Sequence, residues 1–200
     1  METDTVRQAY TSVAKLYIEL FGTSQQVDTD DLALIRRHLG SRSGRVLDLG
    51  CGPGHLTGYL HELGVDAMGV DLVPEFIAHA RASHPGVEFR LGSMEHLDVA
   101  EESIDGILAW YSLIHLPPPE LDGTLEEFRR VLVPAGRLVL GVFDAEEVGA
   151  FDHKVLTAYR WPADEISERL VRAGFREVER LRRPGTDEHR PLAAIAAIAA

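Results

Sequence analysis

The chain has 200 residues, a length that suits one domain with its own hydrophobic core. Asp and Glu outnumber Lys and Arg by 32 to 20, and the formal charge at pH 7 is −12. Nucleic acids and anionic membrane surfaces attract basic proteins, so we expect the chain to bind neither. No stretch is apolar for long enough to span a bilayer, and no secretory signal is evident, which favours a cytoplasmic protein.

Helical and strand patterns alternate along the first 143 residues. Apolar residues at helical spacing predict helices over residues 3–21 and 28–39, each followed by a glycine. Further helices are predicted over 55–63, 74–82 and 119–132, and strands over 45–49, 66–70, 87–91, 104–110 and 137–143. Such alternation is typical of an α/β fold with a parallel sheet.

The regular alternation of strand and helix patterns ends after residue 143. A helix is predicted over 163–173, followed by two strand-like runs at 175–181 and 191–199. Their short polar connection favours an antiparallel pair. The alanine-rich last run suits a helix by propensity as well, and we assign it as a strand from its position in the chain. The prediction is one domain over 1–200, with N-terminal helices at 1–40, a core at 41–144, and a last helix and hairpin at 145–200.

The segment Val46–Gly54 is the most informative in the chain. A strand runs directly into a loop with glycine at positions 50, 52 and 54, and a helix pattern follows. Glycine tolerates positive φ and lets backbone approach a ligand, and the free N–H groups of the next helix face the same point. Asp71 ends the next strand, about 20 residues beyond the loop, where an acid binds ribose hydroxyls in nucleotide-binding βαβ units. The pattern predicts a nucleoside-containing cofactor.

The spacing of the glycines distinguishes between cofactors. The dinucleotide fingerprint G-x-G-x-x-G needs its third glycine at position 55, which is His55 here, and this counts against a nicotinamide cofactor. The string Asp-Leu-Gly-Cys-Gly-Pro-Gly at 48–54 resembles the first motif of class I S-adenosylmethionine-dependent methyltransferases. In that family the loop wraps the methionine part of the cofactor.

Four later segments extend the resemblance to roughly residues 10 to 199. Leu91–Leu97 resembles the turn that holds adenine, and Ser103–Trp110 resembles the fourth strand, which an acid leads. Val131–Leu138 resembles the turn before the fifth strand, and Glu168–Phe175 resembles the last helix. The resemblance implies a Rossmann-like α/β fold. Its seven-stranded, mostly parallel sheet would have an antiparallel C-terminal strand, helices on both faces and an N-terminal helical lid.

The resemblance also implies S-adenosyl-L-methionine as cofactor, with S-adenosyl-L-homocysteine as product. The residues expected to bind it are Tyr17, Asp48, Gly50, Cys51, Gly52, Asp71, Leu72, Ser93, Met94 and Ala109. Asp71 would take both ribose hydroxyls, and the loop backbone would meet the methionine part. Asp48 would accept hydrogen bonds from the loop N–H groups, or have a structural role only. Ser93 departs from the family, which usually has Asp there, so that Glu95 is the other candidate for the adenine amino group.

Several of these side chains have an ordinary structural alternative. Met94 would cover adenine or fill the core. Tyr10 and Tyr17 lie seven residues apart on one helical face, where they either pack in the core or close over the sulfonium by cation–π attraction. Cys51, the only cysteine, is interpreted as a small residue that fits the loop rather than as a nucleophile.

The sequence signals for the part of the site that would bind the methyl acceptor are less specific. Tyr111 and His115 follow the fourth strand, where ligands lie in open α/β sheets, and both are predicted as catalytic residues. His115 would act as a general base, or merely cap an element at the edge of the core. The segment 152–161 would wall an acceptor pocket or form a plain loop.

The predicted function is methyl transfer to a small-molecule acceptor, by a monomer or homodimer that uses no metal. Which acceptor and which atom are not specified by the sequence. Two alternatives stay open. One is a regulator that binds the cofactor without chemistry, and the other is a nicotinamide-dependent oxidoreductase.

Overall fold

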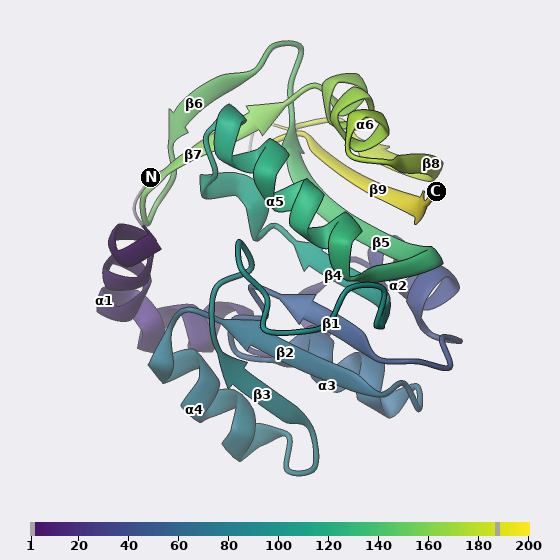
Figure 1. Cartoon of the computed structure of the whole chain (residues 1–200). Helices are drawn as coiled ribbons and strands as arrows, with labels where there is room; N and C mark the ends of the chain where they lie inside the picture. The colour runs from purple at the N-terminus through teal and green to yellow at the C-terminus, as the bar shows by residue number, and fades with distance from the viewer. Residues whose placement is uncertain (1–2, 187–188) are drawn as a thin grey trace.

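The structure is a computed structural model that describes residues 3–186 and 189–200. A single nine-stranded sheet runs through these residues, with helices on both faces (Figure 1). Its strands are β1 (Val46–Leu49), β2 (Ala67–Asp71), β3 (Glu88–Leu91), β4 (Ile104–Trp110), β5 (Leu132–Asp144), β6 (Gly149–Asp152), β7 (Thr157–Trp161), β8 (Phe175–Arg183) and β9 (Leu192–Ala199). The order β3-β2-β1-β4-β5 is parallel throughout.

The C-terminal strands complete the predicted topology. Strand β9 pairs antiparallel with β5, from Arg137 opposite Ile198 to Phe143 opposite Leu192, and β8 pairs antiparallel with the far edge of β9. The alanine-rich run is therefore a strand, as its position in the chain predicted. Its small side chains are almost wholly buried between the helical layers. The α/β fold class with one antiparallel C-terminal strand is confirmed.

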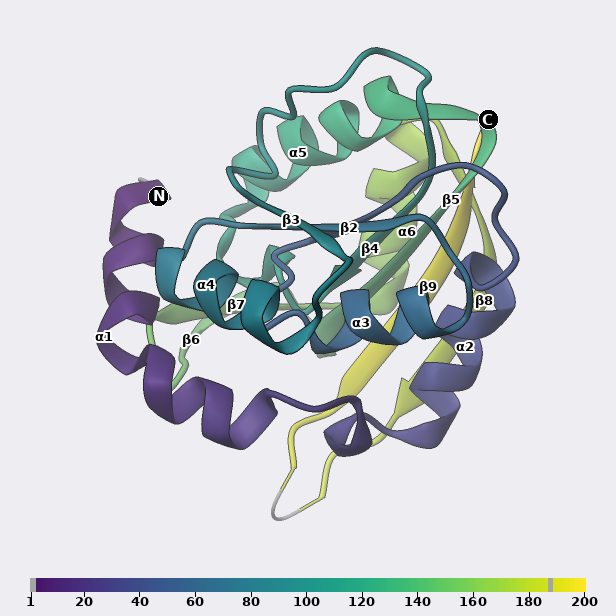
Figure 2. The same cartoon turned by 90° about the horizontal axis from the view of Figure 1, so that it is seen from below.

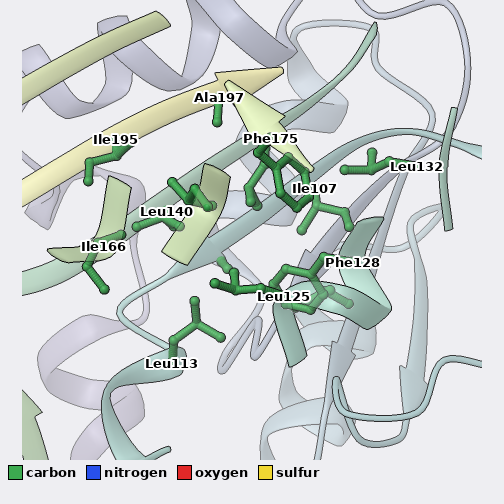
Figure 3. Close-up of a cluster of buried hydrophobic side chains, with 14 of the residues drawn as sticks. Ile107, Leu113, Leu125, Phe128, Leu132, Leu140, Ile166, Phe175, Ile195 and Ala197 are labelled. Carbon is green, nitrogen blue, oxygen red and sulfur yellow. The ribbon is translucent and has the colours of Figure 1, made fainter. Parts of the chain in front are cut away.

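The helices begin and end within one residue of their predicted limits. They are α1 (Thr3–Phe21), α2 (Thr29–Leu39), α3 (His55–Glu62), α4 (Pro74–Ser83), α5 (Pro118–Val131) and α6 (Ala163–Arg172), with short 3-10 turns η1 (Ser24–Gln26) and η2 (Leu113–His115). One core cluster packs α5 and α6 on one face of the sheet, and another packs α2 and α3 on the opposite face. Figure 3 shows the first cluster, in which Leu125 and Phe128 of α5 lie near Ile107 of the sheet.

The hairpin β6–β7 is the largest departure from the sequence prediction, which gave seven strands and left residues 152–161 as a pocket wall or loop. Both strands are short, and their mixed polar and aromatic sequence lacks a clear alternation. The hairpin is held by Trp161 and Ala158, which are buried, and by parallel pairing of Arg160 and Trp161 with the last residues of β5. These contacts are long-range, which is why local pattern did not reveal them.

Helix α1 lies along one side of the molecule, beside α4 (Figure 2). It packs there through a small cluster in which Tyr10 and Tyr17 meet Val73 and Phe76 of the segment after β2. The carboxyl ends of β1, β2 and β4 face this helix, and the candidate site lies between them. Within residues 3–186 and 189–200, no helix has the length and apolar character needed to cross a membrane.

Candidate active site

The glycine loop between β1 and α3 has the conformation that its sequence predicts. Gly50 has φ +73° and Gly52 has φ +52°, which other residues rarely adopt. A Cβ on Gly50 would lie 2.4 Å from Cβ of Ser112, so no side chain fits there. A Cβ on Gly52 would meet only the Tyr17 ring, at 3.8 Å. Backbone of the loop therefore forms one wall of a cleft that the aromatic face of α1 covers.

Asp71, the last residue of β2, ties the loop to the neighbouring strand. Its carboxylate accepts hydrogen bonds from the N–H groups of Gly52 and Val73, both at 2.8 Å. Burial raises the pKa of Asp71 to about 6, although these N–H donors act in the opposite direction. Each carboxylate oxygen has further acceptor capacity, and the side chain lines the cleft, so it can accept from two hydroxyl groups of a ligand.

Asp48 holds a different position from the one predicted. Its carboxylate accepts a hydrogen bond from the Thr57 hydroxyl in α3 at 2.7 Å, rather than from the loop N–H groups. The side chain is only 2% exposed, and burial raises its pKa to about 7. Asp48 therefore fastens α3 to β1 from beneath the loop and does not line the cleft.

Cys51 also turns away from the cleft. Its side chain packs with Ile77 and Phe89 in a cluster under α4, and burial raises the pKa of the thiol well above its ordinary value. A buried thiol of this kind is a poor nucleophile. This placement favours the interpretation of Cys51 as a small residue chosen for fit.

The cleft has a volume of about 80 Å³ and gathers residues from the N-terminal helix, the loop and three strand ends. Eight of the twelve predicted site residues line it: Tyr17, Gly50, Gly52, Asp71, Leu72, Met94, Tyr111 and His115. Seven residues that were not among the predicted site residues line it too: Val6, Tyr10, Val73, Phe76, Gly92, Trp110 and Ser112. Sequence signals pointed to three of these seven: Tyr10 by its spacing from Tyr17, Gly92 by its place in the predicted adenine turn, and Trp110 by its place at the end of the fourth strand.

Ser93 and Ala109 complete the predicted set, and neither side chain lines the cleft. The Ser93 hydroxyl is engaged with Glu95, donating to its carboxylate and accepting from its N–H group, both at 3.2 Å. Ala109 is fully buried in the core within β4. Their neighbours Gly92 and Trp110 line the cleft instead.

His115, in η2 after β4, is hydrogen-bonded through both ring nitrogens. Nδ1 lies 2.8 Å from the carbonyl oxygen of Thr157 in β7, and because a carbonyl only accepts, Nδ1 carries the proton. Nε2 lies 2.8 Å from the hydroxyl of Tyr10 and accepts from it. Burial lowers the pKa of His115, so the ring is neutral at pH 7. The His153 ring packs against it at 5.7 Å between centroids.

Tyr111 has an unusual backbone for an aromatic residue, with φ +51° at the point where β4 ends. Strain of this kind persists only where surrounding structure enforces it, and it is concentrated at functional sites. The ring packs against Trp110 at 5.3 Å and Phe143 at 5.6 Å. Its hydroxyl is buried and has no hydrogen-bond partner among the described residues, and burial raises its pKa above the ordinary range.

A second and larger cavity of about 720 Å³ lies beyond Phe143, at the carboxyl ends of β5 and β7. Phe143 therefore separates this cavity from Tyr111 and the cleft. Phe151 lines it under the guanidinium of Arg190, which lies 4.4 Å above the ring. The contact between the Tyr111 and Phe143 rings thus lies between the cleft and the cavity. Within the described residues, no cluster of three or more His, Cys, Asp or Glu side chains is placed to hold a metal ion.

Comparison with known sequences gives consistent matches. A family described as a methyltransferase domain matches residues 46–136. An uncharacterized methyltransferase of Mycobacterium tuberculosis is 37% identical over 102 residues, which are 51% of this chain and 41% of that protein. The arsenite methyltransferase of Halobacterium salinarum is 34% identical over 152 residues, covering 67% of this chain and 38% of that protein. The chain therefore spans less than half the length of these two relatives.

A solved structure covers nearly the whole chain. The 1,6-didemethyltoxoflavin-N1-methyltransferase of Burkholderia thailandensis, determined with bound 1,6-didemethyltoxoflavin and S-adenosylhomocysteine, is 25% identical. It superposes with a TM-score of 0.83 over 98% of this chain and 88% of that chain. The likeness therefore includes α1 and the C-terminal strands, which lie outside the 46–136 match.

Proposed function

We propose that this chain, which belongs to the class I S-adenosylmethionine-dependent methyltransferase family, transfers a methyl group from S-adenosylmethionine to a small-molecule acceptor. One observation carries the proposal. The glycine loop, Asp71 and His115 come from three different parts of the sequence, yet they line a single cleft at the carboxyl ends of parallel strands. That edge is where open α/β sheets bind ligands.

The residues of the cleft fit the cofactor. Asp71 would hold the ribose hydroxyls, the backbone at Gly50 and Gly52 would meet the methionine part, and Leu72 and Met94 would pack on adenine. The rings of Tyr10, Tyr17 and Phe76 line the same cleft, and aromatic faces attract a cation such as a sulfonium. When bound, the cofactor supplies an electrophilic methyl group on positively charged sulfur.

The chain's own contribution to the reaction is mainly positional. Holding a nucleophile in line with the methyl group can lower the barrier by about 7–11 kcal/mol. His115 is neutral with its lone pair on Nε2, so it can accept a proton from an acceptor hydroxyl or from a protonated nitrogen.

The larger cavity next to the cleft would hold the body of the acceptor, and the reacting group would extend past Phe143 into the cleft beside His115. The cavity's volume of about 720 Å³ lies within the range of small-molecule sites, roughly 300–1,000 Å³. The Burkholderia thailandensis protein, similar over the full chain, has a small planar molecule bound with the cofactor product. This supports a small-molecule acceptor here as well. A monomer or homodimer in the cytoplasm is our prediction for the setting.

The test has two steps. Calorimetry should give micromolar or tighter affinity for S-adenosylhomocysteine and no binding of NAD, which separates the proposal from a nicotinamide-dependent enzyme. The protein is then incubated with methyl-labelled S-adenosylmethionine and a panel of small hydroxyl, amine and heteroaromatic compounds. Transfer of label to a compound supports the proposal. Tight cofactor binding with no transfer across a broad panel would favour a regulator without catalysis.

A further inference from the structure

The cleft is too small for the cofactor while α1 lies as it does. Its volume of about 80 Å³ is well below the roughly 300 Å³ at which small-molecule sites begin. Three side chains of α1 account for this closure, since Val6, Tyr10 and Tyr17 line the cleft from one side. A nucleoside joined to an amino acid therefore enters only if α1 moves away from the sheet.

Few contacts hold α1 in place. The rings of Tyr10 and Tyr17 pack on Phe76, with centroids 6.1 and 5.2 Å apart. Among the described residues, two side-chain hydrogen bonds join α1 to the rest of the protein. Thr11 donates to Glu75 at the exposed surface at 3.2 Å, and Tyr10 donates to Nε2 of His115 at 2.8 Å in the interior. Only the second of these bonds reaches the site.

The second bond involves the one lone pair that His115 has for accepting a proton. The carbonyl of Thr157 fixes the proton on Nδ1 and thereby leaves the lone pair on Nε2, which faces α1. In the closed arrangement the Tyr10 hydroxyl occupies that lone pair. His115 itself is 5% exposed, so solvent hardly reaches the ring while α1 lies on it.

We propose that Tyr10 is a positioning residue that latches α1 onto His115, so that opening the cofactor cleft and freeing the His115 lone pair are a single event. Lifting α1 enlarges the cleft and uncovers Nε2 at the same time, because Tyr10 both lines the cleft and occupies the Nε2 lone pair with its hydroxyl. The hairpin β6–β7 stays attached to His115 through Nδ1, and it keeps the ring oriented while the lid is open. The role of this latch in cofactor entry and catalysis rests on the proposed function, whereas the closure of α1 by the Tyr10–His115 contact does not.

The first measurement is made without ligand. Tyr10→Phe removes the hydroxyl and keeps the ring, and Tyr17→Phe is the matched control, since the Tyr17 hydroxyl makes no hydrogen bond within the described residues. Loss of one interior hydrogen bond should raise amide hydrogen exchange of α1 about fivefold in Tyr10→Phe and leave it unchanged in the control. Thermal unfolding of each variant verifies that the fold is kept.

The second measurement observes His115 directly. In protein labelled with ¹⁵N-histidine, Tyr10→Phe should move the Nε2 resonance toward that of a ring nitrogen without a hydrogen bond and leave Nδ1 unchanged. A purely structural tyrosine would not produce this signature. Unchanged Nε2 shifts, or equal exchange in both variants, would overturn the latch.

The third measurement adds S-adenosylhomocysteine as the probe. Its association rate in Tyr10→Phe should rise by the same factor as the amide exchange, since both report lid opening. An association rate unchanged while exchange rises would show that the lid does not gate the cleft, and it would refute the coupling. If the probe fails to bind even the wild type while the exchange and ¹⁵N results hold, the latch stands and the proposed function fails.

Discussion

The two halves of the candidate site are built in different ways. The cofactor half uses backbone: a loop with glycine at positions 50 and 52, whose N–H of Gly52 bonds to Asp71 in the adjacent strand. The acceptor half uses side chains from distant segments, because His115 bridges Tyr10 of the first helix and Thr157 of a late hairpin. The first arrangement tolerates almost no change in sequence at its glycines. The second can vary with each side chain, which is how one fold serves many acceptors.

We expect the largest effect, on cofactor binding, from a substitution at Gly52, the loop glycine that faces the cleft. Gly52→Arg places a long side chain in the cleft and should abolish binding of S-adenosylhomocysteine in calorimetry. Gly64→Arg is the control for backbone strain, because Gly64 also has positive φ, at +87°, and a Cβ there meets nothing within 4 Å. The control should bind normally. Equal loss of binding in both variants would mean that strain, rather than occupation of the cleft, is responsible.

A change in the side-chain half should affect turnover without affecting binding. If His115 accepts the acceptor's proton, His115→Ala should lower turnover by about 100-fold or more. Affinity for S-adenosylhomocysteine should stay within about fivefold, since only the lid contact is lost. His153→Ala, which removes the neighbouring ring, is the control and should keep most activity. A parallel fall of affinity and turnover in His115→Ala would assign His115 a structural role.

Beneath the loop, Asp48 should make stability depend on pH. Its pKa of about 7 in the fold lies above the ordinary value, so its contribution to stability is full below about pH 4 and is lost as pH rises toward and through 7. Between pH 5 and 8 the wild type should lose up to roughly 3 kcal/mol of unfolding free energy from this group. Asp48→Asn should lower the slope by that amount in urea unfolding measured at both pH values, and leave the smaller part that Asp71 contributes. An identical slope in the variant would show that Asp48 ionises freely in the fold.

The contrast between the halves also explains what the sequence could reveal. Asp71 and the glycine loop were predictable because their spacing is fixed by one strand–loop–helix–strand unit. Helix limits followed from local periodicity and turn residues in the same way. The contact between Asp48 and Thr57 was not predicted, since Thr57 approaches only when α3 packs on β1. The hairpin β6–β7 and the Tyr10–His115 contact were not predictable, because 105 residues separate those two side chains and only the folded sheet brings them together.

The central claim is that Asp71 and the glycine loop form the cofactor site, and the affinity for S-adenosylhomocysteine as a function of pH tests it most directly. With a pKa of about 6, Asp71 is protonated as pH falls from 8 to 5 and loses acceptor strength. Wild-type affinity should therefore weaken over that range, and at pH 8 Asp71→Ala should bind at least about tenfold more weakly, with no such pH dependence. The wild type should also discriminate against a 2′-deoxyribose analogue. Equal affinity of wild type and Asp71→Ala at pH 8, with no discrimination by either, would contradict the account.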